Sequence, residues 1–214
     1  MTFRNREAAR IFALRQRLFS PAAADSLLRD GHHFDAGYEN ENIYGGFREA
    51  ALEFFKTRRI KWHGGLSCDT SIVSSQVACL NCFFPFVSDS SGLRCWLSKL
   101  YPDLDDVLPI SSGAEPPLPD GKQPFLTFEW IGERAYLKER WGSRGQNCTN
   151  VDVLFRYRSV DGKIHLVLAE WKYCEAYDSQ KEYIRTSRRG TDRVAIYRPE
   201  LDLPGTQIVL RCQV

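Results

Sequence analysis

A carboxylate and an ammonium group lie two residues apart at the end of an alternating apolar segment. Residues 164–172 (IHLVLAEWK) alternate with the period of a β-strand, which places Glu170 and Lys172 on the same face as the aliphatic residues at 164, 166 and 168. For a core-facing strand the ordinary expectation is more aliphatic residues at its end, so this combination is unusual. Because two residues of a strand span ~7 Å, Glu170 and Lys172 can serve one small site.

Asp152 lies on the preceding predicted strand, and the register of the hairpin decides whether it can reach Glu170. A two-residue turn would put Asp152 opposite Trp171, on the other face. A three-residue loop ending at Gly162 would put Asp152 directly opposite Glu170. Glycine at the third loop position suits a type I turn with a G1 bulge, because that residue adopts a left-handed conformation. We therefore predict the three-residue loop.

This register predicts a divalent cation at the two carboxylates. Directly opposed carboxylates repel each other unless a cation lies between them. Two carboxylate ligands, completed by water and substrate phosphate oxygens, suit Mg²⁺ or Mn²⁺. Such an ion stabilises charge that develops on a phosphate and lowers the pKa of a bound water, and Lys172 would orient or help to deprotonate that water. Asp152, Glu170 and Lys172 are therefore the candidate catalytic residues, with Asp152 and Glu170 as metal ligands.

Further polar residues could reach this site. Glu129, on the strand predicted at 125–130, is a candidate catalytic residue as a third acidic ligand or the support for one. The alternative, of nearly equal weight, is an exposed strand carboxylate. Gln76 lies in a mostly apolar helix and either supports the site or satisfies buried backbone groups. For Asn81, in the same helix, the backbone role is favoured.

A local excess of positive charge follows the candidate strand. It comprises Lys181, Arg185, Arg188, Arg189, Arg193 and Arg198 against Glu182 and Asp192. A basic helix and loop at this place would neutralise the phosphates of a nucleic acid. The alternative is a solvated charged surface, the usual explanation for such a run. Together with the Glu-x-Lys strand, the run modestly favours phosphate binding.

The overall charge is nearly balanced, with 29 Lys and Arg against 27 Asp and Glu. No global basic field therefore points to a nucleic acid, although a local distribution of charge can still bind one. No apolar stretch approaches the ~20 residues of a membrane span, and the amino terminus lacks the apolar core of a secretory signal. We expect a cytoplasmic protein, not associated with membranes, with reduced cysteines. Cys79 and Cys82 are expected to be buried thiols and not metal ligands.

The pattern of the chain predicts two regions. Residues 1–46 are expected to be an N-terminal helical extension, with helices at 5–19 and 22–29 followed by a loop, and residues 47–214 to be the core domain. The expected core elements are helices at 47–58, 71–84 and 93–100, a surface linker or flexible loop at 109–124, strands at 125–130, 151–158 and 164–172, a helix at 179–189 and a strand at 207–213. This order predicts an α/β or α+β domain with a mixed sheet.

The residues around Asp152 and Glu170 carry a resemblance. Residues 150–154 (NVDVL), the hairpin, and residues 167–173 (VLAEWKY) resemble the signature of the PD-(D/E)XK nuclease superfamily, the restriction endonuclease-like fold. The similarity is closest to a group of bacterial restriction endonucleases and spans residues 47 to 198. Val151 replaces the proline of the signature. Other similar stretches are 60–63, 74–81, 128–130 and 147–152.

The resemblance implies a restriction endonuclease-like core, a central mixed β-sheet flanked by helices, with Asp152 and Glu170 as metal ligands and Lys172 as the catalytic lysine. It implies a metal-dependent nuclease that hydrolyses phosphodiester bonds and uses Mg²⁺ or Mn²⁺. DNA is the expected substrate, and RNA is the alternative. Because cutting both strands of a duplex often uses two active sites, a homodimer is compatible with this activity.

Two other hypotheses compete with a nuclease. One is a catalytically inactive module of the same fold that binds nucleic acid or protein, and the intact set of Asp, Glu and Lys argues against it. The other is an unrelated α/β protein with a coincidental Glu-x-Lys strand, which would leave the register of Asp152 unexplained.

Overall fold

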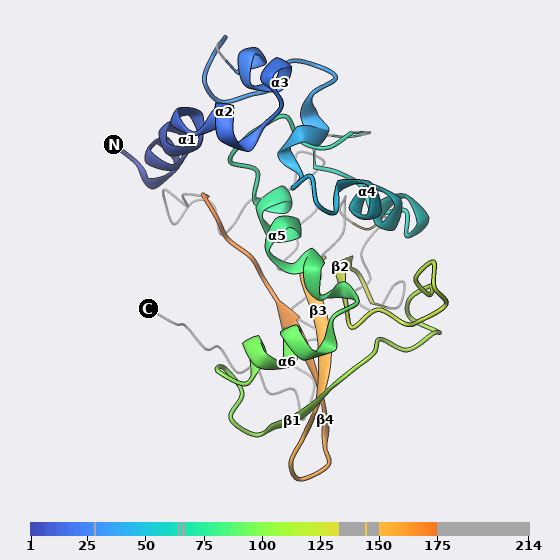
Figure 1. Ribbon diagram of the computed structural model, residues 1–214. Helices are drawn as coiled ribbons and strands as arrows, with labels where there is room; N and C mark the ends of the chain where they lie inside the picture. Colours follow the sequence, from blue (N-terminus) through green and yellow to red (C-terminus); the bar gives the residue numbers. More distant parts are fainter. Residues whose placement is uncertain (28, 64, 66, 133–143, 145–149, 175–214) are drawn as a thin grey trace, which may run out of the picture. The chain divides into compact units, whose positions relative to one another are not determined.

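The computed structural model describes residues 1–27, 29–63, 65, 67–132, 144 and 150–174 (Figure 1). The chain divides into two units, and all the elements described below belong to the unit formed by residues 1–131 and 142–175. The helix expected at 179–189 and the strand expected at 207–213 lie outside the described residues. Within the described part of the chain, no helix is long and apolar enough to cross a membrane.

Short helices make up the N-terminal region. They are α1 (Phe3–Ala13), α2 (Arg15–Leu18), α3 (Pro21–Ser26) and the 3-10 helix η1 (Glu39–Asn42). The side-chain oxygen of Ser20 caps α3, and the proline at its first position needs no backbone donor there. The helix expected at 5–19 is interrupted at Leu14, and the one expected at 22–29 ends at Ser26.

Three α-helices and a short 3-10 helix build the core against the sheet. They are α4 (Arg48–Thr57), α5 (Ser75–Phe83), η2 (Phe84–Val87) and α6 (Ser90–Leu97). Their buried side chains, among them Phe55, Leu80 and Leu97, form one cluster with Val153 and Phe155 of the sheet. Removing this apolar surface from water is the main source of stability for the fold. The three α-helices match those predicted from the apolar periodicity, with shifted ends.

The sheet has four strands, with β3 at its centre. The strands are β1 (Leu104–Leu108), β2 (Leu126–Trp130), β3 (Val151–Ser159) and β4 (Ile164–Ala169). β4 pairs with one edge of β3, while β2 and β1 pair with the first and second halves of the other edge. Every pairing between described strands is antiparallel. The described part of the chain is thus an α+β fold, and the parallel component of the expected mixed sheet has no counterpart in it.

Strand β1 is absent from the predicted elements. Its sequence, LDDVL, breaks the apolar alternation with two aspartates, and its register with β3 shifts between Leu104 and Asp106. Leu104 and Val107 are nevertheless buried, and Asp105 and Asp106 form ion pairs with Arg158 at 3.1 and 3.5 Å. These pairs across neighbouring strands offset the repulsion between two adjacent carboxylates.

The register of the β3–β4 hairpin is the one predicted from Gly162. The ladder keeps a single register up to its last pair, Val153 with Ala169. Continued by one position past the end of β4, the same register would set Asp152 opposite Glu170. Gly162 has a φ of 83°, the left-handed conformation expected of the third loop residue. The prediction of a three-residue loop is therefore confirmed.

The face of the hairpin that carries Glu170 and Lys172 is not the core face. Leu168, on this face, is 55% exposed, whereas Val167 and Trp171 on the other face pack against the core cluster. The core-facing orientation expected for this strand face is therefore wrong. Alternation in the sequence shows that the two faces of a strand differ, but it does not show which face the helices cover. Here the helices cover the face that carries the large Trp171 ring.

Candidate active site

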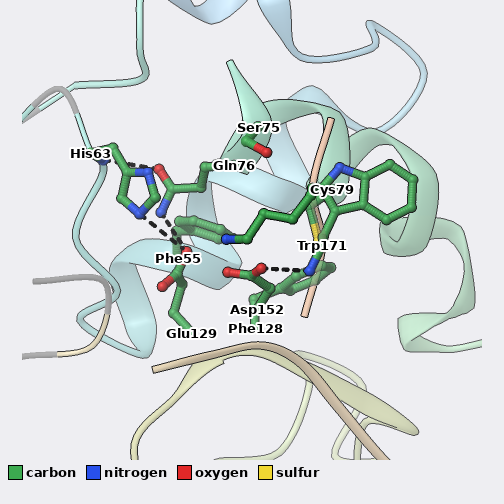
Figure 2. Close-up of a pocket in the computed structure, with 10 residues that line it drawn as sticks. Phe55, His63, Ser75, Gln76, Cys79, Phe128, Glu129, Asp152 and Trp171 are labelled. Carbon is green, nitrogen blue, oxygen red and sulfur yellow. Dashed lines mark hydrogen bonds and ion pairs between the residues drawn. The ribbon is translucent and has the colours of Figure 1, made fainter. Parts of the chain in front are cut away.

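Several segments of the unit meet at a small pocket (Figure 2). A cavity of about 40 Å³ lies between the end of β2, the start of β3, the residues after β4, the first half of α5, and α4 with the residues that follow it. Its lining consists of Phe55, His63, Ser75, Gln76, Cys79, Phe128, Glu129, Asp152, Trp171 and Lys172. Four of the residues singled out from the sequence, Gln76, Glu129, Asp152 and Lys172, thus line one pocket.

Glu129 lies near the end of β2 in a buried and strained position. Its φ is 50°, a left-handed conformation that costs a non-glycine residue conformational free energy. The residue is 3% exposed. Its Oε1 accepts a hydrogen bond of 2.9 Å from Nε2 of Gln76 and lies 3.6 Å from Nε2 of His63. Glu129 is therefore not an exposed strand carboxylate, and its catalytic role stays a prediction.

Asp152 is held by the segment that carries Lys172. The backbone N–H of Trp171 donates a hydrogen bond of 2.6 Å to Oδ2 of Asp152. The ring of Trp171 is anchored in the core against Phe83, with centroids 5.5 Å apart. Lys172 follows directly and lines the pocket. The partly buried tryptophan thus fixes the positions of both Asp152 and the backbone of Lys172.

Glu170 lies just beyond the end of β4, beside the pocket. Its Oε1 is 2.7 Å from Nζ of Lys172, and the side chains of Glu170 and Lys172 are 58% and 44% exposed. Glu170 does not line the cavity. The structure therefore brings Asp152, Glu129 and Lys172 together in the pocket and places Glu170 at the neighbouring position, paired with Lys172.

The acidic groups of the site repel one another. Burial raises the pKa of the Glu129 carboxyl, and the charges of Asp152 and Glu170 add to this increase. Burial likewise raises the pKa of Asp152, and Glu170 adds to the increase, while the hydrogen bond from the Trp171 backbone opposes it. Three carboxylates from three segments thus lie within electrostatic reach of each other.

This donor set fits a cation that prefers oxygen ligands. Asp152 and Glu129 present carboxylates to the pocket. Burial raises the pKa of each, and the charges of the neighbouring carboxylates add to the increase. A bound divalent cation would relieve this repulsion. Among the described residues, no group of three or more His, Cys, Asp and Glu side chains is already arranged to hold a metal ion. Mg²⁺ is often bound by one or two carboxylates with waters and substrate phosphates. The ligand pair Asp152 and Glu170 stays a prediction.

Gln76 connects three parts of the site. It is 6% exposed, and its Oε1 accepts a hydrogen bond of 2.9 Å from the backbone N–H of His63. Its Nε2 donates to the carbonyl oxygen of Lys61 at 3.1 Å and to Glu129 at 2.9 Å. Gln76 therefore satisfies buried backbone groups and also contacts Glu129, and its supporting role in catalysis stays a prediction. Asn81 bonds backbone groups that precede α4, the role favoured for it.

A buried charged cluster next to Glu129 has no counterpart in the sequence analysis. Glu115 is 1% exposed, and its carboxylate lies 3.1 Å from Nε of Arg58 and 2.7 Å from a guanidinium nitrogen of Arg144. Arg144 also donates to the carbonyl of Glu129 at 3.2 Å and to the hydroxyl of Thr127 at 2.7 Å. Arg144 therefore fixes the backbone of the strand that carries Glu129.

Glu115 belongs to the segment 109–124, which is expected to be a surface linker. That expectation is wrong for Glu115 and Ile110, which are both buried. The only local signal is a single carboxylate in a proline-rich stretch (SGAEPPLP), because its arginine partners are distant in the sequence. The residue type of His63 likewise predicts no role at the site, although His63 belongs to one of the stretches that carry the resemblance.

The N-terminal region holds the chain immediately after Lys172. Tyr173 donates its backbone N–H to Oγ of Ser75 at 3.2 Å and its hydroxyl to Oε1 of Glu7 at 2.6 Å. Hydrogen bonds from Arg10 and Tyr173 lower the pKa of Glu7 to about 2. Helix α1 therefore supports the end of the candidate strand, and the expected boundary between residues 46 and 47 stays a prediction.

Two other expectations concern residues away from the pocket. The residues predicted to bind nucleic acid, Lys181, Arg185, Arg188, Arg189 and Arg193, lie outside the described residues. Cys79 is buried as expected, but Cys82 is exposed. The expectation is wrong for Cys82 because two residues that are three apart lie about 60° apart around a helix axis, enough to leave the buried face.

The comparison with protein families gives one match. The model of the family described as "Restriction Endonuclease associating with ARP" matches residues 13–202, which include every residue that lines the pocket. Neither the curated proteins nor the solved structures contain a match. Since the match covers most of the chain, this protein belongs to the family of restriction endonucleases associating with ARP.

Proposed function

We propose that the protein is a metal-dependent nuclease of the PD-(D/E)XK type that hydrolyses phosphodiester bonds in DNA. The observation that carries the proposal is the convergence of Asp152, Glu129 and Lys172 on one pocket, with Glu170 next to it. Burial and backbone strain at Glu129 oppose stability, as is typical of residues kept for chemistry. Membership of a restriction endonuclease family supports DNA as the substrate.

Each residue has a distinct proposed role. Asp152 and Glu170, with Glu129 as a further carboxylate, would hold Mg²⁺ or Mn²⁺, which when bound stabilises charge on the phosphate and acidifies a water. Lys172 orients the attacking water. As the water oxygen bonds to phosphorus and the bridging P–O bond breaks, the ammonium of Lys172 balances the negative charge on the phosphate oxygens.

Cleavage of supercoiled plasmid DNA tests this function. Wild type, Asp152→Asn and Glu170→Gln are incubated with Mg²⁺, with Mn²⁺ and with excess chelator. We expect cation-dependent cutting by the wild type, and a loss of about 100-fold or more in either variant. Glu49→Gln, which changes an exposed carboxylate of α4, is the matched control and should cut at the wild-type rate. Cutting that persists in Asp152→Asn or in chelator would overturn the proposal.

The competing function, an inactive binding module, gives a different result. It predicts binding of DNA without cleavage under every cation condition, by protein whose circular dichroism shows it to be folded. Single-stranded RNA in the same assay decides between the two nucleic acids. Sedimentation of the active protein, alone and with duplex DNA, tests the proposed homodimer.

A further inference from the structure

The segment that leads from α4 into the pocket alternates buried and exposed side chains. Ile60 and Trp62 are buried, and the Trp62 ring stacks on a phenylalanine of α4 with centroids 4.3 Å apart. The residues that alternate with them, Arg59, Lys61 and His63, are exposed. Packing of the two apolar side chains into the core therefore turns the basic side chains outward. Arg59, Lys61 and His63 are called the basic stripe below.

Arg59 has a backbone conformation that favours glycine. Its φ is 54°, and it directly follows Arg58, the C-cap of α4. The N–H of Ile60 donates to the carbonyl of Phe55 at 2.9 Å, the hydrogen bond of a left-handed helix end. Glycine is usual at this position because it has no Cβ. Arginine adds strain here, and a function for its guanidinium is a physical reason to keep it.

Two charges of the basic stripe lack acidic partners in the described part of the chain. Residues 54–68 contain four Lys or Arg residues and no Asp or Glu. Two of the four form ion pairs with glutamates, at 3.6 and 3.1 Å. The other two are Arg59 and Lys61, and no described acidic side chain forms an ion pair with either. Both are therefore available to an external anion.

The basic stripe ends in the pocket. His63 lines the pocket, with its ring toward Glu129 (Figure 2). Gln76 bonds both the carbonyl of Lys61 and the N–H of His63, which holds this part of the stripe against α5. The pocket itself presents the carboxylates of Asp152 and Glu129, which repel phosphates. A polyanion that reaches the pocket therefore needs positive charge beside it.

We propose that Arg59 and Lys61 bind the phosphate backbone of a nucleic acid next to the pocket. His63 then lies at the point where the nucleic-acid strand reaches the carboxylates of the pocket. That the anion is a nucleic acid rests on the proposed nuclease function, whereas the position of the binding site is argued from the basic stripe itself. Lysine and arginine that neutralise phosphates release counterions, so each such contact makes binding weaker as salt increases. The same charges hold the backbone without reading its sequence.

Binding in the absence of cleavage tests the basic stripe. A fluorescein-labelled duplex DNA of mixed sequence is titrated with Asp152→Asn protein, alone and with Arg59→Gly, Lys61→Ala or both, over a series of salt concentrations. We expect the double variant to bind at least about 10-fold more weakly and its salt slope to fall by about 2, near one unit for each lost phosphate contact. Arg94→Ala and Lys99→Ala, which remove exposed cations of α6 and the residues after it, are the matched controls and should leave the slope unchanged.

The Arg59→Gly variant separates a binding role from a structural one. Glycine relieves the strained conformation, so the thermal midpoint should stay equal or rise while DNA binding weakens. Unchanged affinity and slope in the double variant would overturn the proposal, as would a loss of affinity that follows a loss of stability. Failure of the proposed nuclease function would give a different result: the wild type would bind DNA through the basic stripe but would not cleave it.

Discussion

The side-chain amide of Gln76 lies 2.9 Å from Oε1 of Glu129, a buried hydrogen bond between α5 and β2. The same amide group also bonds the backbone of Lys61 and of His63. A single side chain thus fixes the orientation of a candidate catalytic carboxylate and the segment that leads into the pocket. Because buried polar groups need partners, loss of this amide affects the site and the fold together.

Gln76→Ala leaves the Lys61 carbonyl and the His63 N–H without their partner. We expect the free energy of unfolding to fall by about 1–3 kcal/mol, and the cleavage rate at saturating cation to fall as Glu129 loses its orientation. Urea denaturation and plasmid cleavage measure the two effects. Gln16→Ala, which removes an exposed amide of α2, should change neither. Equal stability and activity in Gln76→Ala would show that the amide has no supporting role.

The hairpin illustrates what local sequence can predict. Loop length and the left-handed glycine at 162 are local features, so the register of the β3–β4 hairpin follows from them. The choice of core face is not local, because it depends on which side the helices cover. For this reason the register was predictable, and the orientation of Leu168 was not.

The partners of Glu115 show the opposite case. Arg58 lies at the end of a helix and Arg144 is distant in the sequence, and no periodicity links either one to the proline-rich segment that carries Glu115. Burial of a charge is decided by tertiary packing, which a single sequence does not display. Glu129 is intermediate, because its acidic type suggested the site but its burial and left-handed backbone emerge only from the structure.

Glu129→Gln should stabilise the fold at neutral pH. Burial raises the folded-state pKa of Glu129 above its ordinary 4.5. Its contribution to stability is therefore full below pH 4.5 and is lost as the pH rises through the raised pKa. At neutral pH the variant removes a buried charge and keeps the acceptor for Gln76, so we expect a gain of about 1 kcal/mol together with loss of cleavage. Thermal unfolding across a pH series measures it, and the gain should vanish in acid.

A divalent cation should stabilise the wild type and not Asp152→Asn. Binding to the folded state alone adds about 2.7 kcal/mol when the free cation is 100 times its Kd. The carboxylates that repel one another in the pocket supply the physical reason. Thermal unfolding with Mg²⁺, Mn²⁺ or chelator measures the shift, and titration calorimetry with Mn²⁺ measures the affinity. A shift of equal size in Asp152→Asn and in the control Glu49→Gln would place the cation elsewhere.

Glu115→Ala should destabilise the protein strongly. It leaves two buried guanidinium groups, those of Arg58 and Arg144, without their carboxylate, and breaking a buried pair in this way costs about 3–5 kcal/mol. Asp120→Ala, in the same loop, removes an exposed carboxylate and should cost less than about 0.5 kcal/mol. Urea denaturation of both variants tests the contrast. Similar midpoints would mean that the charged cluster contributes little to the fold.

Glu7 should make the support of the candidate strand sensitive to acid. The hydrogen bonds from Arg10 and Tyr173 lower the folded-state pKa of Glu7 from 4.5 to about 2. The stability from these contacts is therefore present above pH 4.5 and is lost as the pH falls from 4.5 to 2. In urea denaturation over a pH series, wild type should be more stable than Glu7→Gln at neutral pH, and the difference should shrink through this interval. Glu49→Gln should show no such trend. If wild type and Glu7→Gln lose stability in parallel between these pH values, α1 does not hold the end of the strand through this carboxylate.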